Sequence, residues 1–323
     1  MNRAALFATI FAVLWLITSA VLMAGPLDPP AGPVAPAYKT LSEVEPRIAI
    51  NSTNTPGDND SLFKITQPGS YYFIGNITGV AGKYGIEIAV SGVSLDLNGF
   101  DLVGAAAMRA FDGVTVSIDQ LRGITVRNGT VRGWDDAGVD LGFVSYGCLV
   151  KDVRVGDNAG MGINGGVVCT IQDCTAAFNW LSGIRANNGS TIARCSLYLN
   201  AGNGIQVNNG CTISACSIYL SSLDGILAGI GCRITDTSAF TNLGDGIQFG
   251  EGTSASGCTL VNNDGNGVNA GSHCIISNIT ADFNDLNGII VGNGCTVSYS
   301  SSSKSGFNGI YCVGNDNRIS RNA

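Results

Sequence analysis

The sequence predicts an all-β fold in which short parallel strands stack as the coils of a solenoid. Three observations predict it: a 21-residue spacing, short alternating runs of β-branched residues, and columns of asparagine. The spacing is clearest in a glycine followed by isoleucine or valine, which recurs at Gly162, Gly183, Gly204, Gly225, Gly246, Gly267, Gly288 and Gly309. The same mark recurs at longer steps upstream, at Gly85, Gly113 and Gly138, so the repeat covers about residues 85–323.

Each repeat reads as short strands separated by turns. Runs such as "CTISAC" and "GIQV" alternate aliphatic and threonine residues with small polar ones, and glycine, asparagine, aspartate and serine separate the runs. No stretch holds a helical period. A unit of about twenty residues cannot close its own core, so its strands must pair with those of the next unit, about 4.8 Å away. We therefore expect coils of three short strands and three corners.

Two polar columns support this register. Asparagine recurs on one column, with serine in two places: Asn158, Asn179, Asn200, Ser221, Asn242, Asn263, Asn284 and Ser305. Stacked amides can hydrogen-bond along such a column, and an asparagine at a corner can adopt the left-handed backbone region. The residues before the repeated glycines form a second column and predict the turn before a strand: Ser182, Asn203, Asp224, Asp245, Asn266, Asn287 and Asn308.

The phrases "VSLDLNGFDLVG" and "GITVRNGTVRGW", with the asparagine ladder and the rung length, carry a family resemblance. The chain resembles the right-handed parallel β-helix of the pectin-lyase-like superfamily, and more narrowly the secreted bacterial proteins built of such repeats. The resemblance implies a right-handed parallel β-helix with 21-residue rungs, an asparagine ladder and an N-terminal β cap. It leaves function open, because that fold hosts lyases, hydrolases, epimerases, phage tailspikes and adhesins.

Ten of the eleven cysteines fall on two further columns, and Cys312 stands apart. The first holds Cys148, Cys169, Cys211, Cys232, Cys274 and Cys295, and the second holds Cys174, Cys195, Cys216 and Cys258. Metal binding by these cysteines is disfavoured because CxxC pairs are absent and the chain has a single histidine. Stacked side chains point in parallel, about 4.8 Å apart, which is wide for the Cβ atoms of a disulfide. We expect ladders of small, buried, reduced thiols in a narrow core.

The N-terminal segments predict export. Residues 1–24 read as a signal peptide, residues 25–60 as a proline-rich linker and lead-in, and residues 61–84 as strands that cap the first rung. The β-helix itself then fills 85–323, and the end in mid-repeat suggests truncation at the C-terminus. We therefore expect a secreted or cell-surface protein with no membrane span after signal cleavage.

Charge is concentrated in the early, longer rungs. Fifteen charged residues fall within 94–157, and the much longer stretch 158–323 holds no more than that. Carboxylate pairs can bind calcium or exchange protons, arginine can pair with a uronate, and an exposed tryptophan can stack on a sugar. We name as candidate catalytic residues Arg132, Asp135 and Asp136, as substrate-binding residues Arg127, Trp134, Asp140, Lys151 and Arg154, and as calcium ligands Asp135, Asp136 and Asp157.

A net charge of −7 with no basic run argues against a nucleic-acid partner. Three functions fit the remaining features: an exported protein that binds polysaccharide on the flank of the early rungs, a calcium-dependent lyase or epimerase of uronic-acid polymers, and a structural or adhesive surface rod. In polysaccharide lyases of the superfamily, calcium-binding aspartates and an arginine or lysine base line a groove on the flank of the rungs. The residue types match here, but the histidine-bearing motifs of the related hydrolases are absent.

Overall fold

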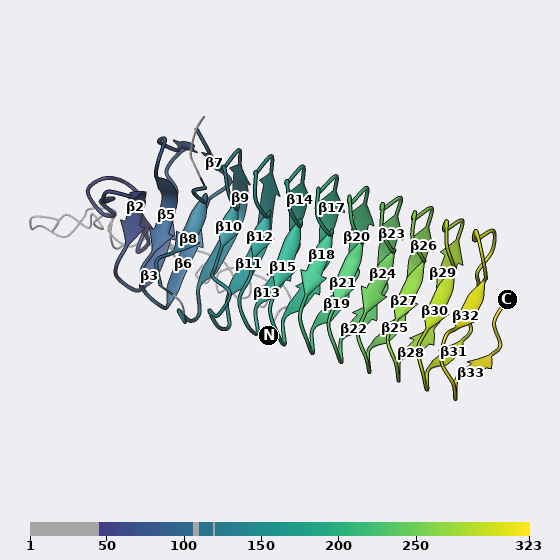
Figure 1. Cartoon of the computed structure of the whole chain (residues 1–323). Coiled ribbons are helices and arrows are strands. Elements are labelled where there is room, and N and C mark those ends of the chain that lie inside the picture. Colours follow the sequence, from purple (N-terminus) through teal and green to yellow (C-terminus); the bar gives the residue numbers. More distant parts are fainter. Residues whose placement is uncertain (1–44, 106–109, 119) are drawn as a thin grey trace, which may run out of the picture. The chain divides into compact units, whose positions relative to one another are not determined.

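The computed structural model describes residues 45–105, 110–118 and 120–323, so the segment predicted as a signal peptide and most of the linker lie outside the described residues. Glu45–Ala323 forms one unit in which successive coils stack along a common axis (Figure 1). All pairings between its named strands are parallel, and they form two sheets. The predicted all-β parallel solenoid is confirmed.

Sheet 1 takes one strand from each coil, and each strand pairs with the next. Its strands are β2 (Ser61–Ile65), β5 (Tyr84–Ile88), β8 (Val114–Val116), β10 (Val139–Asp140), β12 (Ile163–Asn164), β15 (Ile184–Ala186), β18 (Ile205–Val207), β21 (Ile226–Ala228), β24 (Ile247–Phe249), β27 (Val268–Ala270), β30 (Ile289–Val291) and β32 (Ile310–Cys312).

Sheet 2 takes two strand segments from most coils and therefore has two parallel rows. Row 1 contains β1 (Ile48–Ala49), β3 (Gly69–Tyr72), β6 (Val93–Asp96), β13 (Thr170–Gln172), β16 (Thr191–Ala193), β19 (Thr212–Ser214), β22 (Arg233–Thr235), β25 (Ser254–Ser256), β28 (Ile275–Ser277), β31 (Thr296–Ser298) and β33 (Arg318–Ser320). Row 2 contains β4 (Ile77–Thr78), β7 (Asp101–Val103), β14 (Thr175–Ala177), β17 (Ser196–Tyr198), β20 (Ser217–Tyr219), β23 (Ser238–Phe240), β26 (Thr259–Val261) and β29 (Thr280–Asp282). Two long strands, β9 (Thr125–Arg132) and β11 (Leu149–Gly156), run through both rows.

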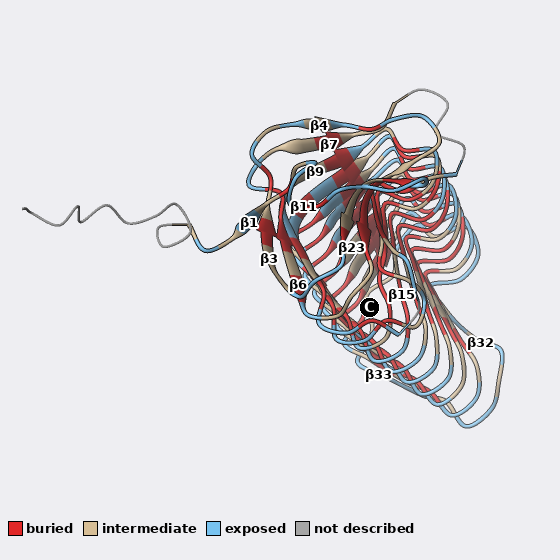
Figure 2. Cartoon of the chain, turned by 90° about the vertical axis from the view of Figure 1, so that its left-hand side faces the viewer, coloured by how far each residue is buried: buried red, intermediate tan, exposed pale blue. Residues whose placement is uncertain are grey.

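The strand register reproduces the 21-residue period of the sequence. In sheet 1, Ile184 pairs with Ile205 and Ile205 pairs with Ile226, and the outer residue Arg185 pairs with Gln206. Side chains alternate between inside and outside along each strand, so the stacked isoleucines line a continuous core. Figure 2 shows the buried residues on the inner side of the coils and the exposed ones on the outer side. The N-terminal strands join the same stack, since β2 pairs with β5 and β3 with β6.

Each coil turns through left-handed backbone residues at three corners. One corner repeats as Val168, Gly189 and Gly210, a second as Asp152, Asp173 and Arg194, and a third as Asp157, Phe178 and Leu199. We expected the asparagines of the ladder to adopt left-handed backbone conformations, and that expectation is wrong. The residue immediately before each asparagine takes the positive φ, which frees the asparagine side chain to turn inward.

The asparagine ladder is present and buried. Asn158 donates from Nδ2 to Asn179 Oδ1 at 2.9 Å, and Asn179 donates in the same way to Asn200 at 2.9 Å. The ladder resumes at Asn242, which donates to Asn263 at 2.8 Å. It is interrupted at Ser221, whose buried Oγ has no hydrogen-bond partner. The repeated glycine makes room for these amides, because a Cβ on Gly183 would lie 2.7 Å from Asn200 Nδ2.

Replacing Ser221 by asparagine is expected to raise the free energy of unfolding by about 1 kcal/mol. The new amide would accept from Asn200 Nδ2 and donate to Asn242 Oδ1, which joins the two halves of the ladder. The neighbouring Gly204 leaves the same space that Gly183 leaves for Asn200. Urea unfolding followed by far-UV circular dichroism measures the change. A midpoint below that of the wild type would show that this coil cannot accommodate the amide.

The second polar column and the cysteine columns also form ladders. Asp245 donates from its backbone N–H to Asp224 Oδ1 at 2.8 Å, and Asn266 donates to Asp245 Oδ1 at 2.6 Å. All eleven cysteines are free, and ten of them are buried. The thiol of Cys232 donates to the carbonyl of Asn208 in the coil before it, with sulfur and oxygen 3.1 Å apart. The predicted burial of the two cysteine columns in the core is confirmed.

Candidate functional site

The predicted site residues come from neighbouring segments, but the structure separates them. Arg127, Arg132, Lys151 and Arg154 lie on β9 and β11 of sheet 2. Asp135 and Asp136 follow β9 in the segment that leads to β10 of sheet 1, and Asp140 ends β10. Asp157 occupies the left-handed corner after β11. The basic residues therefore lie on strands of sheet 2, whereas three of the four acidic residues lie in the connections between strands and Asp140 lies on sheet 1.

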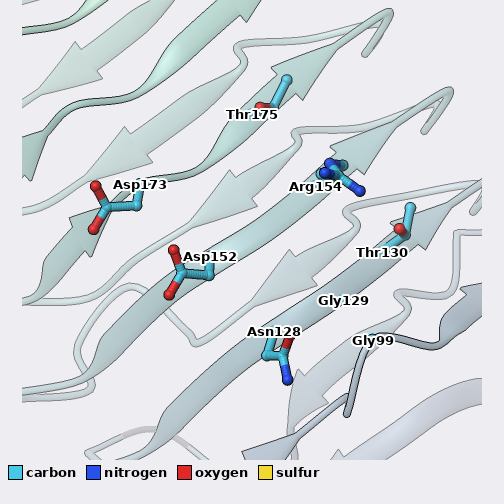
Figure 3. Close-up of a pocket in the computed structure, with 8 residues that line it drawn as sticks. All are labelled: Gly99, Asn128, Gly129, Thr130, Asp152, Arg154, Asp173 and Thr175. Atoms are coloured by element: carbon cyan, nitrogen blue, oxygen red, sulfur yellow. The ribbon is translucent and has the colours of Figure 1, made fainter.

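A groove lies on the outer side of sheet 2, across the early coils (Figure 3). Its volume is about 310 Å³, and it is lined by Gly99, Asn128, Gly129, Thr130, Asp152, Arg154, Asp173 and Thr175. The left-handed residues Asn128, Asp152 and Asp173 bend the chain between the two rows. The groove therefore follows directly from the local backbone conformation of each coil.

Two rows of side chains line this groove (Figure 3). One row is Thr130, Arg154 and Thr175, which pair in register across three coils. The other row is Asn128, Asp152 and Asp173 at successive left-handed corners. The groove thus offers hydroxyls, carboxylates, one amide and one guanidinium, a donor and acceptor set suited to a polyhydroxylated ligand.

The charges in the groove are unevenly paired. Asp173 accepts two hydrogen bonds from Arg194, at 2.6 and 2.9 Å, and this contact lowers the pKa of the Asp173 carboxyl below its ordinary value. Asp152 Oδ2 lies 3.7 Å from Lys151 Nζ. Among the described residues, no salt bridge involves the exposed Arg154. Arg154 is therefore the cation of the groove that is available to a ligand.

The other predicted arginines are already engaged. Arg127 contacts Asp96 at 3.1 Å, and Arg132 contacts Asp101 at 3.3 Å. Both guanidinium groups remain about half exposed, so a ligand could still reach them. The structure places Arg132 in an ion pair with Asp101 on sheet 2.

Trp134 is buried, and the prediction that it stacks on a sugar is wrong. Only 1% of its surface is exposed, and its indole Nε1 donates to the Leu102 carbonyl at 3.3 Å. The ring fills the interior beside two glycines of the repeat, since a Cβ on Gly85 would lie 2.8 Å from it. Trp134 is one of the largest side chains of the core, and its role is packing.

An exposed aromatic row, which the sequence reasoning missed, stands one coil beyond the groove. Tyr198 pairs in register with Ala177 on one side and with Tyr219 on the other. The two tyrosine rings are stacked at 5.7 Å with an angle of 9°, and Phe178 packs edge-on against Tyr198 at 5.3 Å. All three side chains are exposed. The 21-residue spacing of the two tyrosines was the available signal.

Asp136 and Asp140 lie close enough to act on the charge of Asp112, a residue that the sequence reasoning also missed. Asp112 is 6% exposed and its Oδ1 accepts a hydrogen bond from the Ala137 N–H at 2.9 Å. Burial, with the negative charges of Asp140 and Asp136, raises the pKa of Asp112 to about 7. Burial likewise raises the pKa of Asp136. Asp112 comes immediately before the repeat glycine Gly113, a position that forms turns in the later coils. This position in the repeat was the sequence signal that could have identified it.

The predicted calcium ligands Asp135, Asp136 and Asp157 are not gathered into one cluster. Over residues 45–105, 110–118 and 120–323, a single group of three carboxylates has its oxygens within 4.8 Å of one another, and it consists of Asp58, Asp60 and Glu87. This group lies at the N-terminal end of the solenoid, with Asp58 and Asp60 in the loop before β2 and Glu87 on β5. In the same described ranges, no helix is long and apolar enough to cross a membrane.

Solved structures with the same fold include polysaccharide-modifying enzymes. The A-module of the mannuronan C-5 epimerase AlgE4 of Azotobacter vinelandii matches with a TM-score of 0.61 at 13% identity, over 79% of this chain and 91% of that one. The A-module of AlgE6 from the same organism matches with a TM-score of 0.60 at 15% identity, over 86% and 88% of the two chains. A tailspike double mutant of the E. coli bacteriophage HK620 matches with a TM-score of 0.56 at 14% identity, over 86% and 67%.

At these identities the structural similarity shows the fold alone. No curated protein matches the sequence. Residues 112–275, about half of the chain, match the family described as the right handed beta helix region. This family match and the parallel stacking of the coils agree, and the chain belongs to the right-handed β-helix family.

Proposed function

We propose that this chain is an exported protein that binds a polysaccharide bearing carboxylate groups, and that the groove of sheet 2 holds it. The observation that carries the proposal is Arg154, an exposed guanidinium without an ion pair in the described chain, set between the hydroxyls of Thr130 and Thr175. An arginine fork can bind the two oxygens of a uronate carboxylate, and the threonines can bind neighbouring hydroxyls.

The aromatic row extends this groove along the solenoid axis. Thr175 pairs with Ser196 of β17, and Tyr198 ends the same strand, so the tyrosines follow the groove within one coil. Because the two tyrosine rings stack on each other and Phe178 packs against Tyr198, they present apolar ring edges and phenol hydroxyls that can contact sugar rings. A polymer lying along the axis would meet Arg154 first and Tyr198 and Tyr219 next. The fold is shared with a mannuronan epimerase and a tailspike, which supports a polysaccharide ligand.

A binding function is favoured over a catalytic one because the carboxyl best suited to proton exchange, that of Asp112, lies away from the groove. Asp112, with its pKa raised to about 7, is the carboxyl best poised to act as an acid or base at neutral pH. It is buried, and it precedes β8 of sheet 1, whereas the groove lies on sheet 2. A calcium-dependent lyase or epimerase of uronic-acid polymers is the second candidate, and shared fold with the mannuronan epimerases supports it.

Replacing Arg154 by alanine is expected to weaken binding to a uronic-acid polymer about tenfold, because a charged hydrogen-bonded contact of about 1.4 kcal/mol is lost. Isothermal titration with alginate, pectate and a neutral glucan measures it. Tyr198→Ala is expected to weaken binding to acidic and neutral polymers alike. The matched control is Arg233→Ala, an exposed arginine on β22 of the same sheet, which should leave affinity unchanged.

The same polymers also separate the alternatives. Equal affinity of the wild type and Arg154→Ala for the acidic polymers would overturn the assigned groove, and no binding to any polymer would leave the surface-rod function. Unsaturated or shortened products would establish a lyase or hydrolase, and an altered uronate composition, measured by NMR of the recovered polymer, would establish an epimerase. Each product assay is run with calcium and with chelator.

A further inference from the structure

Three carboxylates meet at the N-terminal end of the solenoid, away from the groove. Asp58 and Asp60 lie in the loop before β2, and Glu87 lies on β5, the next strand of sheet 1. Their oxygens lie within 4.8 Å of one another. The loop residues are exposed, but Glu87 is 4% exposed, although the equivalent residues of later coils, such as Arg185, point outward.

Glu87 has one oxygen that nothing in the described chain satisfies. Its Oε1 contacts the Lys64 ammonium at 2.8 Å, whereas its Oε2 is buried and has no hydrogen-bond partner. A buried carboxylate oxygen without a partner carries a large desolvation cost. The Glu87 carboxylate belongs to the cluster formed with Asp58 and Asp60, so one of the three acidic groups has an acceptor oxygen that is still unsatisfied.

Two lysines balance part of the negative charge. Lys64 lies 2.7 Å from Asp58 Oδ2 and 2.8 Å from Glu87 Oε1. Lys83 directs its ammonium to the backbone carbonyls of Asp58 and Ser61 and makes no salt bridge among the described residues. Lys64 is partly exposed and flexible enough to turn into solvent. A second cation could therefore take its place between the carboxylates.

We propose that Asp58, Asp60 and Glu87 form a calcium site that ties the N-terminal loop to the second strand of sheet 1. Calcium prefers carboxylate oxygens at about 2.3–2.6 Å, so one ion can reach three oxygens that lie within 4.8 Å of one another. It would satisfy Glu87 Oε2 and displace the Lys64 ammonium outward. The open N-terminal end of the solenoid would then be closed by an ion in addition to hydrogen bonds.

The test is calcium titration of the chelator-treated full chain by calorimetry, with thermal unfolding in calcium and in sodium chloride of equal ionic strength. The wild type should bind one calcium ion and unfold at a higher temperature in its presence. Glu87→Gln should weaken binding at least tenfold. Lys64→Gln, which removes the competing ammonium, should bind calcium more tightly than the wild type.

Two further variants keep the test decisive. Asp60→Asn changes an exposed loop residue, so it should fold normally and still weaken calcium binding at least tenfold, even if Glu87→Gln fails to fold. Asp264→Asn removes an exposed carboxylate from a distant coil and should bind like the wild type. No calcium binding by the wild type, or undiminished binding by Asp60→Asn and Glu87→Gln, would overturn the site. Neither result bears on the glycan groove.

Discussion

Replacing Asn263 by alanine is expected to lower the free energy of unfolding by about 3 kcal/mol. Asn263 is fully buried in the ladder. Its Nδ2 donates to Asn284 Oδ1 at 2.9 Å and to the Ala239 carbonyl at 3.2 Å, and its Oδ1 accepts from the side chain of Asn242 at 2.8 Å. Alanine would remove the acceptor that the Asn242 side chain and backbone N–H share, and the donor to the Ala239 carbonyl, whereas Asn284 Oδ1 would keep the bond from the Asn263 backbone N–H at 3.1 Å. Each orphaned group costs about 1–3 kcal/mol.

Urea unfolding measured by circular dichroism and by tyrosine fluorescence tests this expectation. Because the coils interact mainly with their neighbours, the two signals are compared before a single free energy is assigned. The matched control is Asp264→Ala, the next residue, whose side chain is exposed while its backbone N–H still donates to the Asn242 carbonyl. We expect that variant to lie within about 0.5 kcal/mol of the wild type. Equal losses in the two variants would refute a stabilising ladder.

The fold could be predicted in detail from the sequence, because in a solenoid the repeat length determines which residues of neighbouring strands pair. Residues that stack on one another in neighbouring coils are 21 positions apart in the sequence. Asn179 and Asn200 could therefore be placed in contact without further information. The backbone conformation at the corners was harder. Left-handed φ values occur at Phe178 and Leu199, residue types that rarely adopt them, and composition gave no signal for this.

The candidate site could be predicted only in part, because residues that are close in sequence leave the coil on different sides. Arg132, Trp134 and Asp136 are near neighbours in the chain, yet the first is exposed on sheet 2, the second is in the core and the third leads toward sheet 1. The strand β9 ends at Arg132 and the left-handed Gly133 turns the chain, so residues two apart no longer share a face, and the irregular spacing of the early coils obscured this turn. Arg154 was named as a substrate-binding candidate from its charge and lines the groove, whereas Tyr198 lay in the regular coils, where charge gave no guidance.

Replacing Asp112 by asparagine is expected to raise the free energy of unfolding at pH 8 by about 2–4 kcal/mol. The folded protein raises the pKa of this carboxyl to about 7, chiefly through burial, whereas in the unfolded chain it ionises near 4. Between these values the folded state holds a proton that the unfolded state has released. Wild-type stability therefore falls as the pH rises from about 4 to 7, and the full penalty is present above pH 7.

Asparagine removes the charge and keeps the Oδ1 acceptor for the Ala137 N–H, so the hydrogen bond at 2.9 Å can persist. The variant and the wild type should have nearly equal stability at pH 4 and should diverge steadily toward pH 7, as measured by urea unfolding at one-unit steps. Asp136 and the other titrating groups are common to both proteins, so the difference between the two curves reports Asp112. The exposed Asp264→Asn should follow the wild type at every pH. Parallel curves for Asp112→Asn and the wild type would mean that Asp112 is ionised in the folded protein at neutral pH, and its environment would then have to stabilise the charge.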